Sequence, residues 1–180
     1  MHRILVTGST GAGKSTLARA LGERIGVPYY EMDALFYAGP GWAEDPRFGT
    51  RVAEIASTGA WVFDSYGPTE VRDLLWERAD TVVWLDYPRR VVMPRVLRRS
   101  ARRTLTRERV FNGNRETLTG WFRPEHPARW SWAQHTSRAA DIAARARNPD
   151  YEPLRTVRLT TPRQTKTWLA RLPAAPAPPP

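Results

Sequence analysis

The chain contains no cysteine and almost no lysine. Without cysteine among its 180 residues, disulfides, thiolate nucleophiles and cysteine metal sites are excluded. No apolar run approaches the roughly 20 residues that a membrane helix needs. The first residues also lack the apolar core and cleavage site of a secretory signal. We therefore expect no membrane partner and a cytoplasmic location.

The charge balance is strongly basic, with a formal net charge of +10. Lys14 and Lys166 are the two lysines, so nearly all of the 28 basic residues are arginine. A basic chain can bind nucleic acid or phosphate. A GC-rich codon bias would also raise arginine throughout the chain, together with the abundant alanine, proline and tryptophan. Charge alone therefore gives nucleic acid only weak support as a partner.

Short apolar runs alternate with helical patterns along the chain. We expect strands at 3–7, 28–32, 61–63, 81–85 and 154–159, and helices at 14–25, 48–59, 70–78, 88–103, 132–148 and 162–172. This alternation favours βαβ units and a parallel sheet covered by helices on both faces. Residues 1–172 are expected to form one domain, in which 104–130 are polar and irregular. Residues 173–180 contain only proline and alanine, which predicts a disordered tail.

A glycine-rich segment after the first strand carries the strongest functional signal. Residues 8–15 read Gly-Ser-Thr-Gly-Ala-Gly-Lys-Ser and match G-x-x-x-x-G-K-[ST], the Walker A pattern, in full. Its amides and the following helix N-terminus form a nest for phosphate. We expect Lys14 to reach the β- and γ-phosphates and Ser15 to ligate Mg²⁺. The predicted nucleotide-binding set is Gly8, Ser9, Thr10, Gly11, Ala12, Gly13, Lys14, Ser15 and Thr16. A chance glycine turn is the alternative, and the strand before and helix after the segment argue against it.

Three aspartates follow predicted strands and are candidates for the chemistry. Asp64 and Asp86 each end an apolar run, so either can supply the Mg²⁺ carboxylate at the carboxyl edge of the sheet. Each can equally be a helix cap. Asp33 follows the second strand and can orient or deprotonate an acceptor hydroxyl, or reach Mg²⁺ through water. A structural turn or cap is the equal alternative for Asp33.

Arginine dominates residues 89–115, where Glu108 is the one acidic residue. Arg95, Arg99 and Arg102 recur on one helical face. Phosphoryl transfer is catalysed mainly by positioning and by cations around the phosphates, which Arg95 and Arg99 can supply. Arg138 is a weaker candidate for the same role. A solvated basic face is the alternative for the stretch as a whole.

Four segments, at 4–16, 62–68, 80–88 and 95–99, together resemble the adenylate-kinase-like branch of small P-loop kinases. The chain is more closely similar to the group labelled topology modulation or FlaR-related proteins, through Met32-Asp33, Gly41-Trp42 and residues 79–90. The resemblance implies an α/β, three-layer P-loop kinase-type fold with a five-stranded parallel sheet. It also implies a short arginine-rich lid at about 104–130.

The same resemblance assigns residues to roles. It favours Asp64 as the Mg²⁺ carboxylate. It places Arg95 and Arg99 where two lid-helix arginines of the family contact the nucleotide base and the phosphates. This chain departs from the family by lacking an arginine directly after Pro68, so Arg72 is a candidate substitute for the arginine that binds AMP. The group label suggests a DNA-related role, which these kinase-like residues do not explain.

Two functions follow from these patterns. The first is an ATP-dependent phosphotransferase that uses Mg²⁺ and acts on a small nucleoside, nucleotide or other hydroxyl acceptor. The second is a nucleotide-binding regulator or slow NTPase that acts on nucleic acid.

Aromatic residues of the loop after the second strand, and one after the third, either stack on an acceptor ring or pack internally. They are Phe36, Tyr37, Trp42 and Tyr66.

Overall fold

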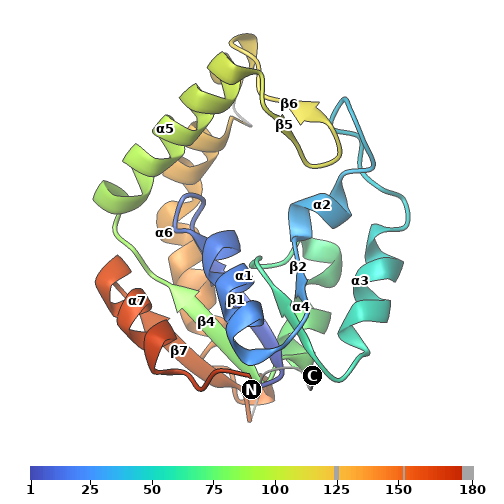
Figure 1. Cartoon of the computed structure of the whole chain (residues 1–180), viewed down its shortest axis with the longest axis vertical. Helices are drawn as coiled ribbons and strands as arrows, with labels where there is room; N and C mark the ends of the chain where they lie inside the picture. Colours follow the sequence, from blue (N-terminus) through green and yellow to red (C-terminus); the bar gives the residue numbers. More distant parts are fainter. Residues whose placement is uncertain (124–125, 152, 176–180) are drawn as a thin grey trace, which may run out of the picture.

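Five parallel strands form one sheet with β1 (Arg3–Gly8) at its centre (Figure 1). The order is β2 (Tyr29–Tyr30), β3 (Trp61–Phe63), β1, β4 (Thr81–Leu85) and β7 (Arg155–Leu159). The computed structural model describes residues 1–123, 126–151 and 153–175. The predicted five-stranded parallel sheet is confirmed. All of β3 and β4 is buried, which explains why these strands read as unbroken apolar runs rather than alternating ones.

Helices cover both faces of this sheet (Figure 1). They are α1 (Lys14–Ile25), α2 (Met32–Phe36), α3 (Phe48–Ala56), α4 (Thr69–Arg78), α5 (Arg89–Thr106), α6 (Pro127–Arg145) and α7 (Pro162–Arg171). Successive side chains of β1 point to opposite faces of the sheet and pack in two separate hydrophobic cores. Leu5 packs with α2, α3, α4 and α6 on one face, whereas Ile4 and Val6 pack with α1, α5 and α7 on the other. This alternation fixes the carboxyl end of β1 between the two helical layers.

The second predicted strand is shorter than expected. β2 spans two residues, and Met32 already begins α2. Met32 and Leu35 are both buried, a helical spacing that overrides the extended pattern read across 28–32. Asp33 therefore lies in the first turn of a short helix rather than at the end of a strand.

Residues 104–130, expected to be irregular, contain ordered elements. After α5 ends, β5 (Arg109–Val110) and β6 (Asn114–Arg115) form a hairpin, and the 3₁₀ helix η1 (Thr119–Phe122) precedes α6. Phe111, Asn112 and Gly113 make the turn, with φ of 40°, 62° and 97°. Nδ2 of the Asn112 side chain donates to the backbone carbonyls of Ala34 and Tyr37 at 3.0 and 2.6 Å. The hairpin is thereby attached to α2 and to the loop that follows it. Residues 124 and 125 of this region lie outside the described residues.

The C-terminal part follows the sequence pattern up to its last segment. After the short 3₁₀ helix η2 (Pro149–Tyr151), β7 and α7 complete the sheet and its cover. The amide of Ala175 donates to the carbonyl of Arg24 at 2.6 Å. Residues 176–180, which belong to the tail expected to be disordered, lie outside the described part of the chain. Within the described ranges, every helix is too short or too polar to cross a lipid bilayer.

Candidate functional site

The glycine-rich segment forms the turn between β1 and α1, in the strand–loop–helix context that its pattern requires. Gly8, Gly11 and Gly13 have φ of 141°, 84° and 95°, which disfavour other residues. A Cβ on Gly11 would lie 2.4 Å from Cγ2 of Val96 in α5. The nearest neighbour of a Cβ on Gly13 is Nη1 of Arg95, at 4.0 Å. The loop is therefore tightly packed against α5 at Gly11 and open at Gly13, where α1 begins.

Lys14 is the first residue of α1. Its Nζ donates to the Ser9 carbonyl at 3.2 Å, which folds the side chain back over the loop. Burial lowers the pKa of Lys14 to about 8. Charged neighbours then act in both directions: carboxylates raise the pKa and guanidinium groups lower it. They are Asp64, Arg138, Asp33 and Arg99. The ammonium thus lies where these predicted residues converge.

Asp64 follows β3 and its side chain is held by two hydrogen bonds. Oδ1 accepts from the Met32 amide at 2.9 Å, and Oδ2 accepts from the Tyr29 hydroxyl at 3.0 Å. The Tyr29 hydroxyl also interacts with Ser15. Burial first, and then the charge of Asp64, raise the pKa of Tyr29 well above its usual value. The Tyr29 hydroxyl therefore contacts both Ser15 and Asp64, the two predicted metal ligands.

Asp86 forms an ion pair with an arginine of the edge strand β7. Nε of Arg158, on β7, donates to Asp86 Oδ2 at 2.9 Å. Residue type alone left Asp64 and Asp86 as alternatives for the Mg²⁺ carboxylate, and the family resemblance favoured Asp64. The geometry separates them, because Asp64 shares a partner with Ser15 whereas Asp86 forms an ion pair with an arginine.

Asp33 and Lys14 have Asp64 and Arg99 as common charged neighbours. The side chain of Asp33 keeps some contact with solvent, but nearby protein atoms exclude much of the water around its carboxylate. Desolvation by these atoms, followed by repulsion from Asp64, raises the pKa of Asp33. Lys14 and the guanidinium groups of Arg99 and Arg103 act in the opposite direction. A carboxylate of raised pKa beside the glycine loop is suited to accept a proton from a hydroxyl.

Arg95 and Arg99 both project from α5 toward the glycine loop and its surroundings. Nη1 of Arg95 donates to the Ala12 carbonyl at 3.4 Å, and its Cζ lies 5.8 Å from the ring centroid of Tyr87. Arg99 is half-buried, and burial followed by repulsion from Arg103 lowers its pKa. Within the described ranges, the buried Nε of Arg99 has no hydrogen-bond partner. Arg99 therefore retains hydrogen-bonding capacity next to Asp33.

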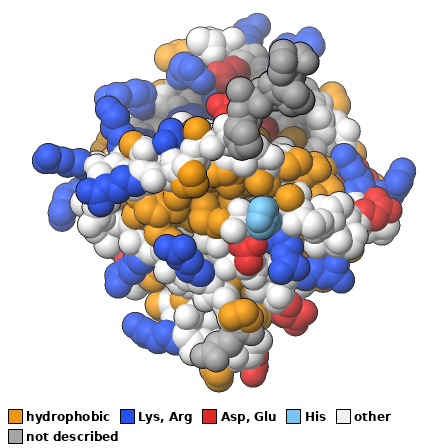
Figure 2. All heavy atoms as spheres, turned by 60° about the horizontal axis from the view of Figure 1, so that its bottom comes forward, with side chains coloured by type: hydrophobic (Ala, Val, Ile, Leu, Met, Phe, Trp, Pro, Cys, Tyr) orange, Lys and Arg blue, Asp and Glu red, His pale blue; other side chains and the backbone are white. Residues whose placement is uncertain are grey.

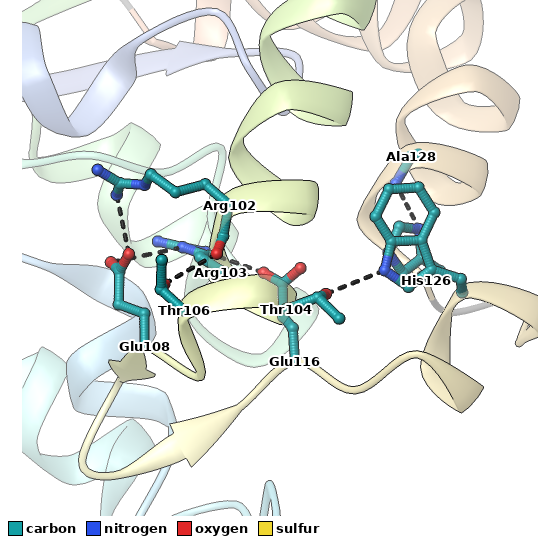
Figure 3. Close-up of polar contacts among 9 residues, drawn as sticks. Arg102, Arg103, Thr104, Thr106, Glu108, Glu116, His126 and Ala128 are labelled. Atoms are coloured by element: carbon teal, nitrogen blue, oxygen red, sulfur yellow. Dashed lines mark hydrogen bonds and ion pairs between the residues drawn. The ribbon is translucent and has the colours of Figure 1, made fainter.

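Two acidic residues fasten the hairpin to α5 (Figure 3). Glu108 pairs with Arg102 at 2.9 Å, and Glu116 pairs with Nη1 of Arg103 at 3.1 Å. The Glu116 side chain is only 6% exposed. Sequence reasoning missed Arg103 and Glu116, because nothing in their spacing indicates a pair 13 residues apart. Part of the arginine-rich stretch is thus neutralised by its own hairpin.

The aromatic residues of the loop after α2 pack on one another. Tyr37 meets Trp42 edge-on with centroids 5.1 Å apart, and it stacks on Phe111 of the hairpin at 6.2 Å. Phe36 meets Phe48 at 5.0 Å. The Trp42 amide donates to Asn114 Oδ1 at 2.6 Å, which adds a polar contact to the hairpin. These rings join the hairpin to the loop near Asp33.

No family model and no curated protein matches the chain. Solved structures of small kinases do match over nearly its whole length. A sugar kinase from Janibacter sp. HTCC2649, solved without ligand, is 18% identical, with a TM-score of 0.51 over 94% of this chain and 93% of that one. A shikimate kinase from Acinetobacter baumannii, in complex with shikimate, is 21% identical, with a TM-score of 0.50 over 95% and 90%. At this identity the likeness shows the fold alone. The chain has the α/β fold of the small P-loop kinases.

Proposed function

We propose that the chain is an ATP-dependent phosphotransferase that moves a γ-phosphoryl group to a small hydroxyl-bearing acceptor, such as a nucleoside or nucleotide. The observation that carries this proposal is the convergence of Lys14, Ser15 and Asp64 at the open end of the glycine loop. A lysine held at a lowered pKa beside two carboxylates is suited to a polyanion, because the ligand's charge favours its protonated form.

The glycine loop binds the triphosphate in this proposal. Amides of residues 8–16 and the N-terminus of α1 contact the phosphates, and Lys14 bridges the β- and γ-phosphates. The residues present also fit Mg²⁺, since a hydroxyl and a buried carboxylate are hard oxygen ligands. Ser15 and Asp64 would hold the ion, and Tyr29 keeps their oxygens oriented. When bound, Mg²⁺ neutralises charge on the phosphate oxygens.

Side chains from α2 and α5 complete the reaction in this proposal. Asp33 orients the acceptor hydroxyl and takes its proton as the new O–P bond forms and the bond to the leaving β-phosphate oxygen breaks. Arg95 and Arg99 neutralise the charge of the transferring group. The hairpin after α5 acts as the lid that excludes water. We also propose that the chain belongs to the adenylate-kinase-like branch of small P-loop kinases, with the FlaR-related group as its nearest subgroup.

The alternative, a regulator or slow NTPase acting on nucleic acid, needs an accessible basic surface. Arg102 and Arg103 are already paired with carboxylates of the hairpin. Figure 2 shows the face at the bottom of Figure 1, where apolar side chains gather in the middle and basic ones are spread around the rim. The described side chains of that face, which lies away from the hairpin, form no continuous basic track for a phosphate backbone.

A transfer screen distinguishes the two functions. Terminally labelled ATP with Mg²⁺ is incubated with pools of nucleosides, nucleotides, sugars and sugar acids. The proposal expects label on one pool, its loss in Lys14→Ala, and its retention in Lys166→Ala, the matched control at the other lysine. Slow hydrolysis without transfer, together with DNA binding that falls steeply with salt, would establish the alternative instead.

A further inference from the structure

α5 and α6 lie side by side (Figure 1), and a groove of about 500 Å³ opens at the surface between them. It is lined by Met93 of α5 and by Ala128, Arg129, Trp132 and Ala133 of α6. Leu97 follows Met93 by one helical turn and is 44% exposed, so it extends the apolar wall along α5. An uncovered strip of apolar surface therefore borders both helices.

Trp132 is the largest side chain of this groove, and it is held in place while it stays open to solvent. The Cζ atom of Arg89 lies 4.8 Å from the indole centroid, and its Nη2 donates to the Thr136 hydroxyl at 3.1 Å. The guanidinium group thus covers one face of the ring and fixes it on α6. Trp132 nevertheless remains 57% exposed. A tryptophan that is already fixed loses little freedom when a partner covers it, and tryptophan is enriched among the residues that dominate binding energy.

The groove lies on a different side of α5 from the candidate active site. Arg95 and Arg99, which project toward the glycine loop, are each two residues from Leu97 in the sequence. Two residues correspond to about 200° around a helix, so the two arginines and Leu97 point in nearly opposite directions. A nucleotide on the glycine loop therefore leaves the groove uncovered.

Positive charge borders the groove. Arg129 is one of its lining residues, and Arg90 and Arg98 are exposed on α5, on either side of its two groove residues in the sequence. Within the described ranges, neither Arg90 nor Arg98 forms an ion pair. α5 contains no acidic residue, and Asp141, the acidic residue of α6, lies more than two turns beyond the groove residues of that helix. A complementary partner therefore carries acidic side chains around an apolar centre.

We propose that this groove binds an acidic amphipathic helix of a partner protein. Two helices that lie side by side present a furrow into which a third helix packs its side chains. Apolar residues of the partner, one turn apart, cover Met93, Leu97 and Trp132, and its flanking carboxylates pair with Arg90 and Arg98. A second copy of this chain would bring the same arginines to the groove, so repulsion disfavours a dimer formed there. The proposal does not depend on the proposed function.

Stapled helical peptides of about 18 residues, labelled with fluorescein, test the groove on the full chain. The first peptide carries leucine on one face and glutamate elsewhere. The second has lysine in place of glutamate, and the third is a scrambled form of the first without an apolar face. Fluorescence polarisation should show saturable binding of the first peptide, and at least about tenfold weaker binding of the other two.

Substitutions locate the bound peptide on the chain. Leu97→Gln and Trp132→Ala should each weaken binding of the first peptide at least about tenfold, because each removes an apolar anchor. Both side chains lie at the surface, so these variants should keep the circular dichroism spectrum of the wild type. Leu118→Gln is the matched control, since Leu118 is 70% exposed and is not a groove residue. It should bind the peptide as the wild type does.

A charge reversal tests the basic border. The double variant Arg90→Glu/Arg98→Glu should weaken binding of the glutamate peptide at least about tenfold and strengthen binding of the lysine peptide. Arg78→Glu, at an exposed arginine of α4, is the control and should change neither affinity.

Several results would overturn the proposal. One is that no peptide binds saturably. Another is that the first and the scrambled peptide bind alike, since charge alone then explains binding, or that Leu118→Gln weakens binding as much as Leu97→Gln does. A wild-type dimer in sedimentation velocity that Leu97→Gln dissociates would assign the groove to a second copy. Binding to vesicles of anionic lipid that Leu97→Gln abolishes would assign it to a membrane surface.

Discussion

Replacing Lys14 with methionine should stabilise the nucleotide-free protein while abolishing triphosphate binding. Burial lowers the pKa of Lys14 from 10.5 to about 8, so at pH 7 the fold holds a charge that its surroundings disfavour. At about 1.36 kcal/mol per pKa unit, this gap corresponds to about 3 kcal/mol of lost stability. Methionine removes the charge and also the 3.2 Å hydrogen bond to Ser9, which offsets about 1 kcal/mol. We expect a net gain of about 2 kcal/mol in the free energy of unfolding.

The sign of the pH dependence follows from the direction of the shift. The folded pKa of Lys14 lies below the unfolded one, so the unfolded chain binds more protons between pH 8 and pH 10.5. The wild type therefore gains stability relative to Lys14→Met as the pH rises through this window. The electrostatic part of the difference falls from about 3 kcal/mol at pH 7 to about 1 kcal/mol near pH 10.

Urea unfolding of the wild type and variants at pH 7 and pH 10 measures this difference. Lys166→Met is the matched control, because Lys166 is exposed on α7. Its effect should stay within about 0.5 kcal/mol at both pH values. The reasoning is refuted if Lys14→Met unfolds at a lower urea concentration than the wild type at pH 7, or if its advantage does not shrink at pH 10.

Three further substitutions probe other parts of the site. Gly11→Ala should lower the free energy of unfolding by about 2 kcal/mol or more, since its Cβ would lie 2.4 Å from Val96 Cγ2 at a φ of 84°; a melting temperature equal to the wild type's would contradict the packing described. Tyr29→Phe removes a hydrogen bond to Asp64, and calorimetry should show that Mg²⁺ strengthens ATP binding about tenfold less than in the wild type, with metal-free binding unchanged. Arg99→Ala should lower turnover at least about tenfold with little change in ATP affinity; normal turnover would remove Arg99 from the site.

The fold and the conformation of the glycine loop could be predicted because their signals are local. β1 reads as an apolar run, and the glycine pattern directly follows it. Each of the three motif glycines has a positive φ, a property that the residue type itself indicates. The parallel sheet followed from strands alternating with helical segments, since each crossover needs a helix. These features depend on neighbours in the sequence, so the sequence alone carries them.

Features that depend on distant partners were missed or left open. Asp64 and Asp86 each end an apolar run, so residue type alone did not separate them; the family resemblance favoured Asp64, and their partners Tyr29 and Arg158 differ in the structure. The hairpin at 109–115 had a usable signal, because Asn-Gly favours a tight turn, but the polar composition around it suggested a loop. The contact of Arg72 and Arg138 with the ring of Tyr66 depends on how α4 and α6 pack, and no spacing along the chain encodes it.

Calorimetric titration of the wild type with ATP and Mg²⁺ at pH 8.5, in two buffers of different ionisation enthalpy, tests the central claim most directly. The bound triphosphate should restore the proton that burial removes from Lys14. We therefore predict saturable binding with uptake of more than about half a proton from the buffer. Lys14→Met, which is expected not to bind the triphosphate, should give no binding heat in either buffer. Absence of binding, or binding with the same heat in both buffers, would contradict the account.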